Sequence, residues 1–221
     1  SDKLKRYSMF ITGVISSALG ISLITKAGLG TSPITSLAFV LTFIFPHSLG
    51  EFTMLVNTVM FLIQAALLGK AFGKVQLLQL PAALLFSACI DGWMYILGFW
   101  KTGSYVGQVL MLLLGCVFLG LGIAFEVIPN VLILPGEGLV RVIAGLTGWR
   151  FGLVKTGFDM SIVASAVGVS LFFTGHVLGI REGTVLAALI VGSISHFFIE
   201  KVSNVLEGWI PDYSDAGDAC P

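Results

Sequence analysis

Charged residues are scarce in this chain. Its 221 residues include only 12 Lys and Arg and 12 Asp and Glu, a charged share of 11% with no net charge. Soluble domains carry about 25% charged residues, whereas 56% of the residues here are hydrophobic and the mean hydropathy is +0.99. The composition predicts an integral membrane protein. Because no basic surplus exists, nucleic acid is excluded as an expected partner.

Cysteines are few, and the common catalytic motifs are lacking. Cys89 and Cys116 fall inside apolar runs and Cys220 lies near the end of the chain, so no disulfide framework is expected. The sequence has no Gly-x-Ser-x-Gly elbow, no His-Glu-x-x-His pair, no phosphate-binding loop and no Cys/His cluster with metal-ligand spacing. We therefore expect no enzyme and no bound cofactor or metal.

Long apolar runs are what the sequence has in abundance. A helix needs about 20 apolar residues to cross a bilayer, and six runs approach that length: 7–25, 52–69, 77–99, 106–128, 152–173 and 184–199. Two others, 34–45 and 139–146, are too short, because a helix rises only about 1.5 Å per residue. We expect an all-α polytopic membrane protein whose two short helices are re-entrant half-helices that enter the membrane without crossing it.

A glycine-containing break precedes each short helix. Residues 27–35 read Ala-Gly-Leu-Gly-Thr-Ser-Pro-Ile-Thr, and residues 132–138 read Leu-Ile-Leu-Pro-Gly-Glu-Gly. Glycine tolerates unusual backbone conformations, proline suits the first turn of a helix, and Thr or Ser caps it. The opening N–H groups of the first short helix, from Ile34, Thr35 and Ser36, would then be free to meet a solute. Irregular backbone is tolerated at membrane depth only within protein or beside water, so both breaks are candidate binding elements.

The two halves of the sequence match at an offset of 102 residues. The offset pairs landmarks and polar residues: Pro33 with Pro135, Gly50 with Gly152, Gly73 with Gly175, Thr35 with Glu137 and Asn57 with Asp159. We predict a first repeat at 1–103, a second at 104–203 and an acidic C-terminal tail at 204–221, together forming one membrane domain. Three spans per half would invert the second repeat relative to the first. If the short helices cross, eight spans would instead make the repeats parallel.

The distribution of Lys and Arg favours six spans. With six spans, seven of these cations lie on the same side of the membrane as the N-terminus and three lie on the other side, with Arg141 and Lys155 set aside. With eight spans, the numbers are six and four. Cytoplasmic loops carry the excess of cations. We therefore expect a protein of the bacterial inner membrane with a cytoplasmic N-terminus.

The run from Ala18 to Pro33, which ends in Gly-Thr-Ser-Pro, resembles the bacterial YczE/YitT-type integral membrane proteins. The closing run from Glu182 to Gly192 resembles the Gly-Thr…Gly pattern of the same family. This sequence has His196 where that family commonly has an acid, and Thr35 where the family often reads Trp-Asp after the proline. The resemblance implies a small membrane protein that acts as a transporter.

Polar residues within the apolar segments are the candidate site, because ionisable groups are costly in a membrane and are functional candidates by default. We expect the substrate to be bound by residues of both breaks and nearby helices: Gly28, Gly30, Thr31, Ser32, Thr35, Asn57, Gly136, Glu137, Gly138 and Arg141. Asp91 and Asp159 are candidates for a coupling ion or proton. Alternatives remain open, since four-residue spacing also allows ion pairs between Glu137 and Arg141 and between Lys155 and Asp159. Asp91 could serve helix packing instead, and Glu126 and His196 could mark membrane boundaries.

Three functions are compatible with these features. The first is a secondary transporter or facilitator for a small polar solute, anionic or zwitterionic, held by the positive N-terminal ends of the half-helices. The second is a channel built from the same elements. The third is a partner or substrate-capture subunit that needs a second protein. The glycine-rich spans suit either a homodimer or packing within one chain.

Overall fold

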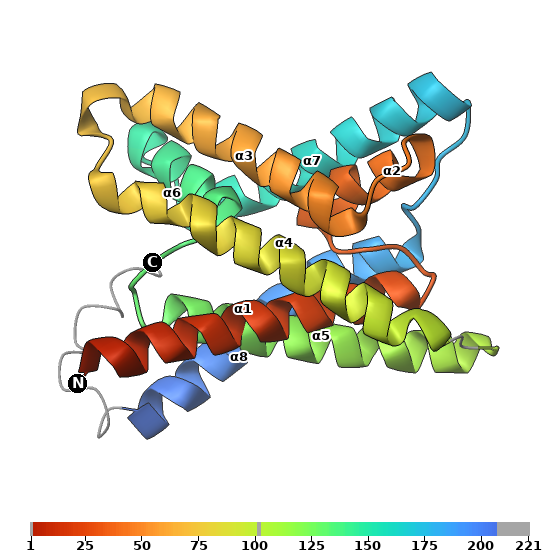
Figure 1. The fold of residues 1–221 in the computed structure, drawn as a ribbon, viewed down its shortest axis with the longest axis horizontal. Coiled ribbons are helices and arrows are strands. Elements are labelled where there is room, and N and C mark those ends of the chain that lie inside the picture. Colours follow the sequence, from red (N-terminus) through yellow and green to blue (C-terminus); the bar gives the residue numbers. More distant parts are fainter. Residues whose placement is uncertain (1, 101–102, 207–221) are drawn as a thin grey trace.

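The computed structural model describes residues 2–100 and 103–206, and its regular elements within these residues are all helices (Figure 1). The α-helices are α1 (Asp2–Lys26), α2 (Ser36–Ile44), α3 (Leu49–Leu68), α4 (Gln79–Ile96), α5 (Tyr105–Val127), α6 (Pro135–Thr147), α7 (Phe151–Thr174) and α8 (Glu182–Leu206). Six of them are long and apolar enough to cross a membrane. The prediction of an all-α membrane protein with six spans is confirmed. From residue 207 on, the predicted acidic tail lies outside the described residues.

The two remaining helices, α2 and α6, are short. They have 9 and 13 residues, so they are about 14 and 20 Å long, well below the roughly 30 Å of a hydrocarbon core. Proline begins each of these segments: Pro33 opens a 3-10 turn, Pro33–Thr35, that leads into α2, and Pro135 is the first residue of α6. A proline fits there because the first N–H of a helix has no partner within it.

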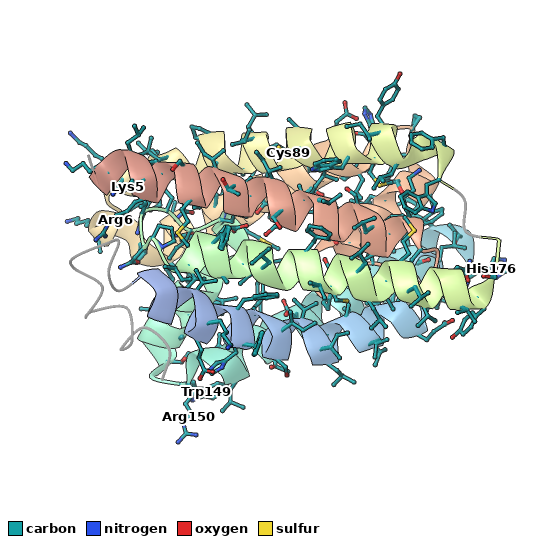
Figure 2. All side chains as sticks on the ribbon, turned by 90° about the horizontal axis from the view of Figure 1, so that it is seen from below. Lys5, Arg6, Cys89, Trp149, Arg150 and His176 are labelled. Carbon is teal, nitrogen blue, oxygen red and sulfur yellow. The ribbon has the colours of Figure 1, made fainter. Side chains whose placement is uncertain are left out.

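The helices form two layers. Four long helices lie side by side in the order α4, α1, α5, α8, as Figure 2 shows from below. The other layer contains α2, α3, α6 and α7, which lie above these four in Figure 1. In this second layer α2 packs against α7 and α6 packs against α3, so each short helix contacts a long helix from the other half of the chain.

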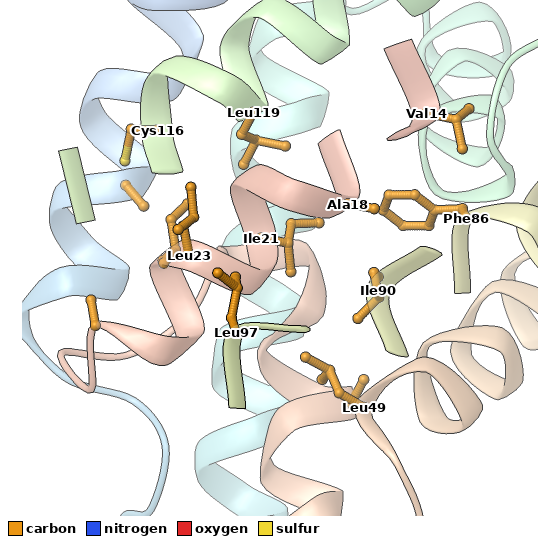
Figure 3. Close-up of a cluster of buried hydrophobic side chains, with 14 of the residues drawn as sticks. Val14, Ala18, Ile21, Leu23, Leu49, Phe86, Ile90, Leu97, Cys116 and Leu119 are labelled. Atoms are coloured by element: carbon orange, nitrogen blue, oxygen red, sulfur yellow. The ribbon is translucent and has the colours of Figure 1, made fainter. Parts of the chain in front are cut away.

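Glycines bring α1 and α5 into close contact at the centre of the first layer. A Cβ on Gly13 would lie 2.8 Å from the carbonyl oxygen of Gly122, and a Cβ on Gly20 would lie 2.7 Å from that of Gly115. Gly13 precedes Gly20 in α1, whereas the partner of Gly13, Gly122, follows the partner of Gly20, Gly115, in α5. The two helices are therefore antiparallel. The core continues from this seam towards α4 through apolar side chains, several of them drawn in Figure 3: Val14, Ala18, Ile21, Phe86, Ile90, Cys116 and Leu119.

The succession of helices is the same in both halves of the chain, namely one long, one short and two long. Pro135 follows Pro33 by 102 residues at the start of the short segments, and Phe151 follows Leu49 by 102 at the start of the next helices. The remaining helix starts, those of α5 and α8, follow their counterparts by 103. The spacing of the sequence landmarks therefore reappears in the order and the starting positions of the helices.

Candidate functional site

A cavity of about 430 Å³ lies between the two layers, bounded by the six long helices, both short helices and the breaks before them. Most of its lining is apolar, but polar side chains reach it from the first break and from all of these helices except α2 and α4. They are Ser17, Ser32, Thr35, Thr53, Asn57, Glu126, Glu137, Arg141, Lys155, Thr156, Asp159, Ser195 and His196. A largely apolar cavity with a few convergent polar groups is the usual form of a small-molecule site.

The first break reaches the cavity through a chain of buried hydroxyl groups. The Thr31 Oγ1 lies 2.9 Å from that of Thr25 and 3.0 Å from that of Thr35, and the Thr35 Oγ1 lies 2.7 Å from the Ser32 Oγ. Ser32 and Thr35 line the cavity. Two of the N–H groups that we expected to be free are not, because the 3-10 turn directs the N–H of Thr35 to Ser32 O and that of Ser36 to Pro33 O.

The glycines of the first break and Thr31 serve contacts with α8 and do not line the cavity. Both glycines have positive φ angles, 76° for Gly28 and 128° for Gly30, and a Cβ on Gly30 would overlap Thr184. The backbone N–H of Thr31 donates to the Thr184 Oγ1 at 3.1 Å. The Arg181 Nη1 donates to the carbonyl oxygen of Gly28 at 3.1 Å. These contacts join the break to the start of α8.

The second break presents backbone donors to the cavity. Gly136 and Glu137 both line it, and within the described residues their N–H groups have no hydrogen-bond partner, whereas the next one, from Gly138, donates to Leu134 O. Arg141 also lines the cavity and is exposed. No ion pair within 4 Å joins Glu137 to Arg141 in the part of the chain that the structure describes. Both groups are therefore available to other partners.

Gly138 is directed away from the cavity lining, against α3 and α4. A Cβ there would lie 2.8 Å from the Gln64 Oε1 and 3.2 Å from the Gln79 Nε2. The two glutamines are buried, and neither side-chain Oε1 has a hydrogen-bond partner within the described residues. Gly138 thus allows α6 to approach two buried amides.

The polar pair predicted by the 102-residue offset, Asn57 and Asp159, does face the cavity. The Asn57 Nδ2 donates to Thr53 O at 2.9 Å within α3. The Asp159 Oδ1 accepts a hydrogen bond from the Lys155 Nζ at 2.9 Å, an ion pair whose members are both partly buried. Asp159 is therefore neutralised by its own helix, as the four-residue spacing allowed.

Asp91 lies outside the cavity and fastens α4 to the start of α3. Its Oδ2 accepts from the Ser48 Oγ at 2.6 Å and its Oδ1 from the Gly50 N–H at 2.7 Å. Gly50 has no room for a side chain, since a Cβ would overlap Ser87 O. We call Ser48, Gly50, Ser87 and Asp91 the α3–α4 contact. Both carboxylate oxygens of Asp91 have hydrogen-bond donors in this contact. This placement agrees with the alternative that Asp91 serves helix packing.

The corresponding place between α7 and α8 is open. Gly152, the counterpart of Gly50, lies on the cavity wall, and a Cβ added to it would have no neighbour within 4 Å among the described residues. Ser87 of α4 is 4% exposed, whereas its counterpart Leu189 of α8 is 69% exposed. In the part of the chain that the structure describes, α7 and α8 have no contact comparable with that between α3 and α4. The cavity therefore extends between α7 and α8.

Glu126 is the cavity residue that the sequence analysis did not select. Its side chain comes from the last turn of α5 and is only 4% exposed. The Oε1 accepts a hydrogen bond of 2.6 Å from the Ser17 Oγ of α1, and the carboxyl has no ion pair within the described residues. Proximity to the end of a span hid this burial, because it comes from packing against α1.

Comparisons with known proteins place this architecture in a family. The chain matches, over residues 4–200, the family described as a family of unknown function (DUF6198). It is 27% identical over 217 residues to the uncharacterized membrane protein YczE of Bacillus subtilis, covering 98% of this chain and 95% of that protein. It is also 27% identical over 201 residues to the uncharacterized protein YyaS of the same organism, covering 89% and 94%. No solved structure is significantly similar. The resemblance to YczE is confirmed, and the chain belongs to the DUF6198 family.

Proposed function

We propose that this protein is a secondary transporter for a small zwitterionic solute, working by alternating access in the bacterial cytoplasmic membrane with its N-terminus inside. One observation carries the proposal. Two corresponding pairs of helices border one cavity and are in opposite states: α3 and α4 are joined, while α7 and α8 are apart. A transporter needs two such gates that are never open together.

The proposal includes an inverted repeat, and the α1–α5 seam supports it. Gly13 and Gly115 are 102 residues apart, as are Gly20 and Gly122, and the contacts cross between these pairs. Two equivalent helices that meet antiparallel in this way are related by an axis perpendicular to them. If both helices cross the membrane, that axis lies in the membrane plane, the arrangement found in many secondary transporters. The short helices α2 and α6 are then re-entrant half-helices.

Charges around the cavity support a zwitterionic rather than a purely anionic solute. Lys155 and Asp159 neutralise each other. Of the remaining groups, Glu137 suits an ammonium group, while Arg141 and the free N–H groups of Gly136 and Glu137 suit a carboxylate. Both ends of such a solute would meet partners on α6. Asn57 of α3 and Thr35 and Ser32 of the first break add hydrogen-bonding groups to the cavity lining.

A reversible cross-link between α7 and α8 tests the gate. The variant carries Arg150→Cys and Ser193→Cys in a chain whose Cys89, Cys116 and Cys220 are replaced by Ala. These two positions correspond to Ser48 and Asp91, whose side chains are in contact, so closure of α7 on α8 should bring the cysteines within disulfide distance. Uptake of radiolabelled zwitterionic amino acids into proteoliposomes is then measured before oxidation, after oxidation and after reduction.

We expect saturable uptake that falls at least tenfold on oxidation and returns on reduction. The single Ser193→Cys variant, oxidised in the same way, is the matched control and should retain its uptake. Transport at an unchanged rate by the fully cross-linked protein would contradict the gate. Flux that does not saturate would indicate a channel instead.

A further inference from the structure

We propose that Glu126 carries the coupling proton of this cavity, with Ser17 as the residue that positions its carboxyl group. The proton site stands on the geometry around Glu126, and its coupling to transport rests on the proposed function. The site is distinct from Asp91 and Asp159, because both of those carboxylates are already satisfied by hydrogen bonds or an ion pair.

Burial without a counter-ion is the first step of the argument. Glu126 is 4% exposed, and its only hydrogen-bond partner within the described residues is the Ser17 hydroxyl. An ionised carboxylate in such surroundings is costly unless a cation or several donors compensate it, and neutralisation by a proton removes most of that cost. A carboxyl group in this position therefore exchanges readily between a proton and a compensating partner.

Access to the cavity is the second step. The Ser17 hydroxyl holds one carboxyl oxygen, Oε1, and the other has no hydrogen-bond partner in the part of the chain that the structure describes. Glu126 also lines the cavity, which extends between α7 and α8. A proton can therefore reach the second oxygen from the cavity and leave by the same route. Binding converts the carboxylate and a proton into a neutral carboxylic acid, and no other bond changes.

The repeat supplies the third step, because the equivalent place in the molecule has no acid. At the offset of 102 residues, Ser17 corresponds to Leu119 and Glu126 corresponds to Ile24. Both of these are buried apolar residues of the core around the α1–α5 seam. Packing alone is thus satisfied by a leucine and an isoleucine at this seam. Leu119 also lines the cavity, so neither packing nor contact with the cavity by itself requires a serine and a glutamate here.

Other titratable groups around the cavity are differently placed. Glu137 and Arg141 come from α6, Lys155 and Asp159 from α7, and His196 from α8, while α1 and the first break contribute only hydroxyl groups among the polar lining. Glu137 is only partly buried, and the side chain of His196 is 66% exposed. Glu126 is the most deeply buried of the acids that line the cavity. Carboxyl groups in such contrasting environments take different roles.

Infrared spectroscopy of the full-length protein in lipid tests the proton site without any solute. We expect a carboxylic C=O band that appears on acidification in the wild type and is absent from Glu126→Gln. Ser17→Ala should retain this band at a higher frequency, because the hydrogen bond to the carboxyl is lost. Glu200→Gln, which alters an exposed acid of α8, is the matched control and should leave the band unchanged. A wild-type band that persists in Glu126→Gln would overturn the proposal.

Cysteine labelling tests coupling to the gate. Thr156→Cys on the cavity wall is labelled with a maleimide in the cysteine-free background, and Ser104→Cys at an exposed helix start corrects for thiol reactivity. Because a neutral acid is easier to enclose, we expect acidification to slow labelling several-fold. Glu126→Gln should label slowly at every pH. If the labelling rate of Glu126→Gln depended on pH as it does in the wild type, the coupling step would be overturned. The proton site and the proposed function can fail separately. If infrared spectroscopy confirms the proton on Glu126 but the α7–α8 cross-link does not block transport, the proposed function is refuted and the proton site stands.

Discussion

The two halves of this chain have similar helices but unequal packing. In α4 33% of the most apolar stretch is buried, and in its counterpart α8 only 6%. The corresponding values for α3 and α7 are 39% and 17%. Hydropathy alone does not account for this difference, since α4 and α8 are almost equally apolar. Similar sequences thus support both a joined and a separated helix pair, and the difference between them depends on a few contacts.

Substitution of Gly50 should have the largest effect, because it removes the space on which the α3–α4 contact depends. A leucine there would overlap Ser87 and Asp91, and we expect Gly50→Leu to destabilise the protein by about 3 kcal/mol. Gly152→Leu is the matched control, since nothing among the described residues lies near its Cβ position. Thermal unfolding in detergent measures both. Equal losses of stability would mean that the two gates do not differ as described.

Asp91→Ala should have the next largest effect. It removes two hydrogen bonds to a carboxylate and leaves the Ser48 hydroxyl and the Gly50 N–H without their partner. We expect a loss of about 2 kcal/mol and faster maleimide labelling of a cysteine placed at Thr53. The counterpart substitution Ser193→Ala lies on an exposed part of α8 and should change neither quantity. Unchanged labelling in Asp91→Ala would show that this carboxylate does not hold the gate.

Thr184→Val tests the link between the first break and α8. The substitution keeps the side-chain volume but removes the acceptor of the Thr31 N–H, which is buried. We expect a loss of about 1 kcal/mol. The control is Thr156→Val, whose hydroxyl group donates only to a carbonyl group of its own helix. A thermal shift in the control as large as in Thr184→Val would argue against a special role for this contact.

The smallest effect is expected from making α7 resemble α3. The double substitution Lys155→Thr and Asp159→Asn introduces the residues found at the corresponding positions, Thr53 and Asn57. It exchanges a partly buried ion pair for neutral polar groups, so the free energy of unfolding should change by less than about 1 kcal/mol. Unfolding of purified protein measures this. A larger loss would show that the ion pair, and not only the open gate, distinguishes the halves.

The fold was accessible from the sequence because its signals are local. Apolar runs of span length, the prolines at 33 and 135 and the offset between the halves each depend on neighbouring residues or simple spacing. The six spans and two short helices follow from these signals. The separation of α7 from α8 did not follow, since it depends on the arrangement of whole helices.

The site was accessible only in part, because its remaining features depend on distant partners. Ser32, Thr35, Asn57 and Glu137 reach the cavity as expected. The role of Asp91 depends on Ser48 and Gly50, and the conformation of Gly30 is fitted to Thr184, which is 154 positions further along the chain. The burial of Glu126 comes from packing against α1. One signal in the sequence could have identified it: the position equivalent to Glu126 in the first repeat is occupied by an apolar residue, Ile24.

The hydrogen bonds at the start of α8 limit how this helix can move. Its first turn is tied to the first break by three contacts, from Gly183 N–H to Leu29 O, from Thr31 N–H to Thr184 and from Arg181 to Gly28. Beyond that turn α8 packs along α5, so with its start fixed any tilt across α5 would make it a lever of 25 residues, about 37 Å long. A swing of only about 15° would carry its other end by roughly 10 Å. Large displacement at one membrane surface is thereby compatible with a nearly stationary backbone at the other.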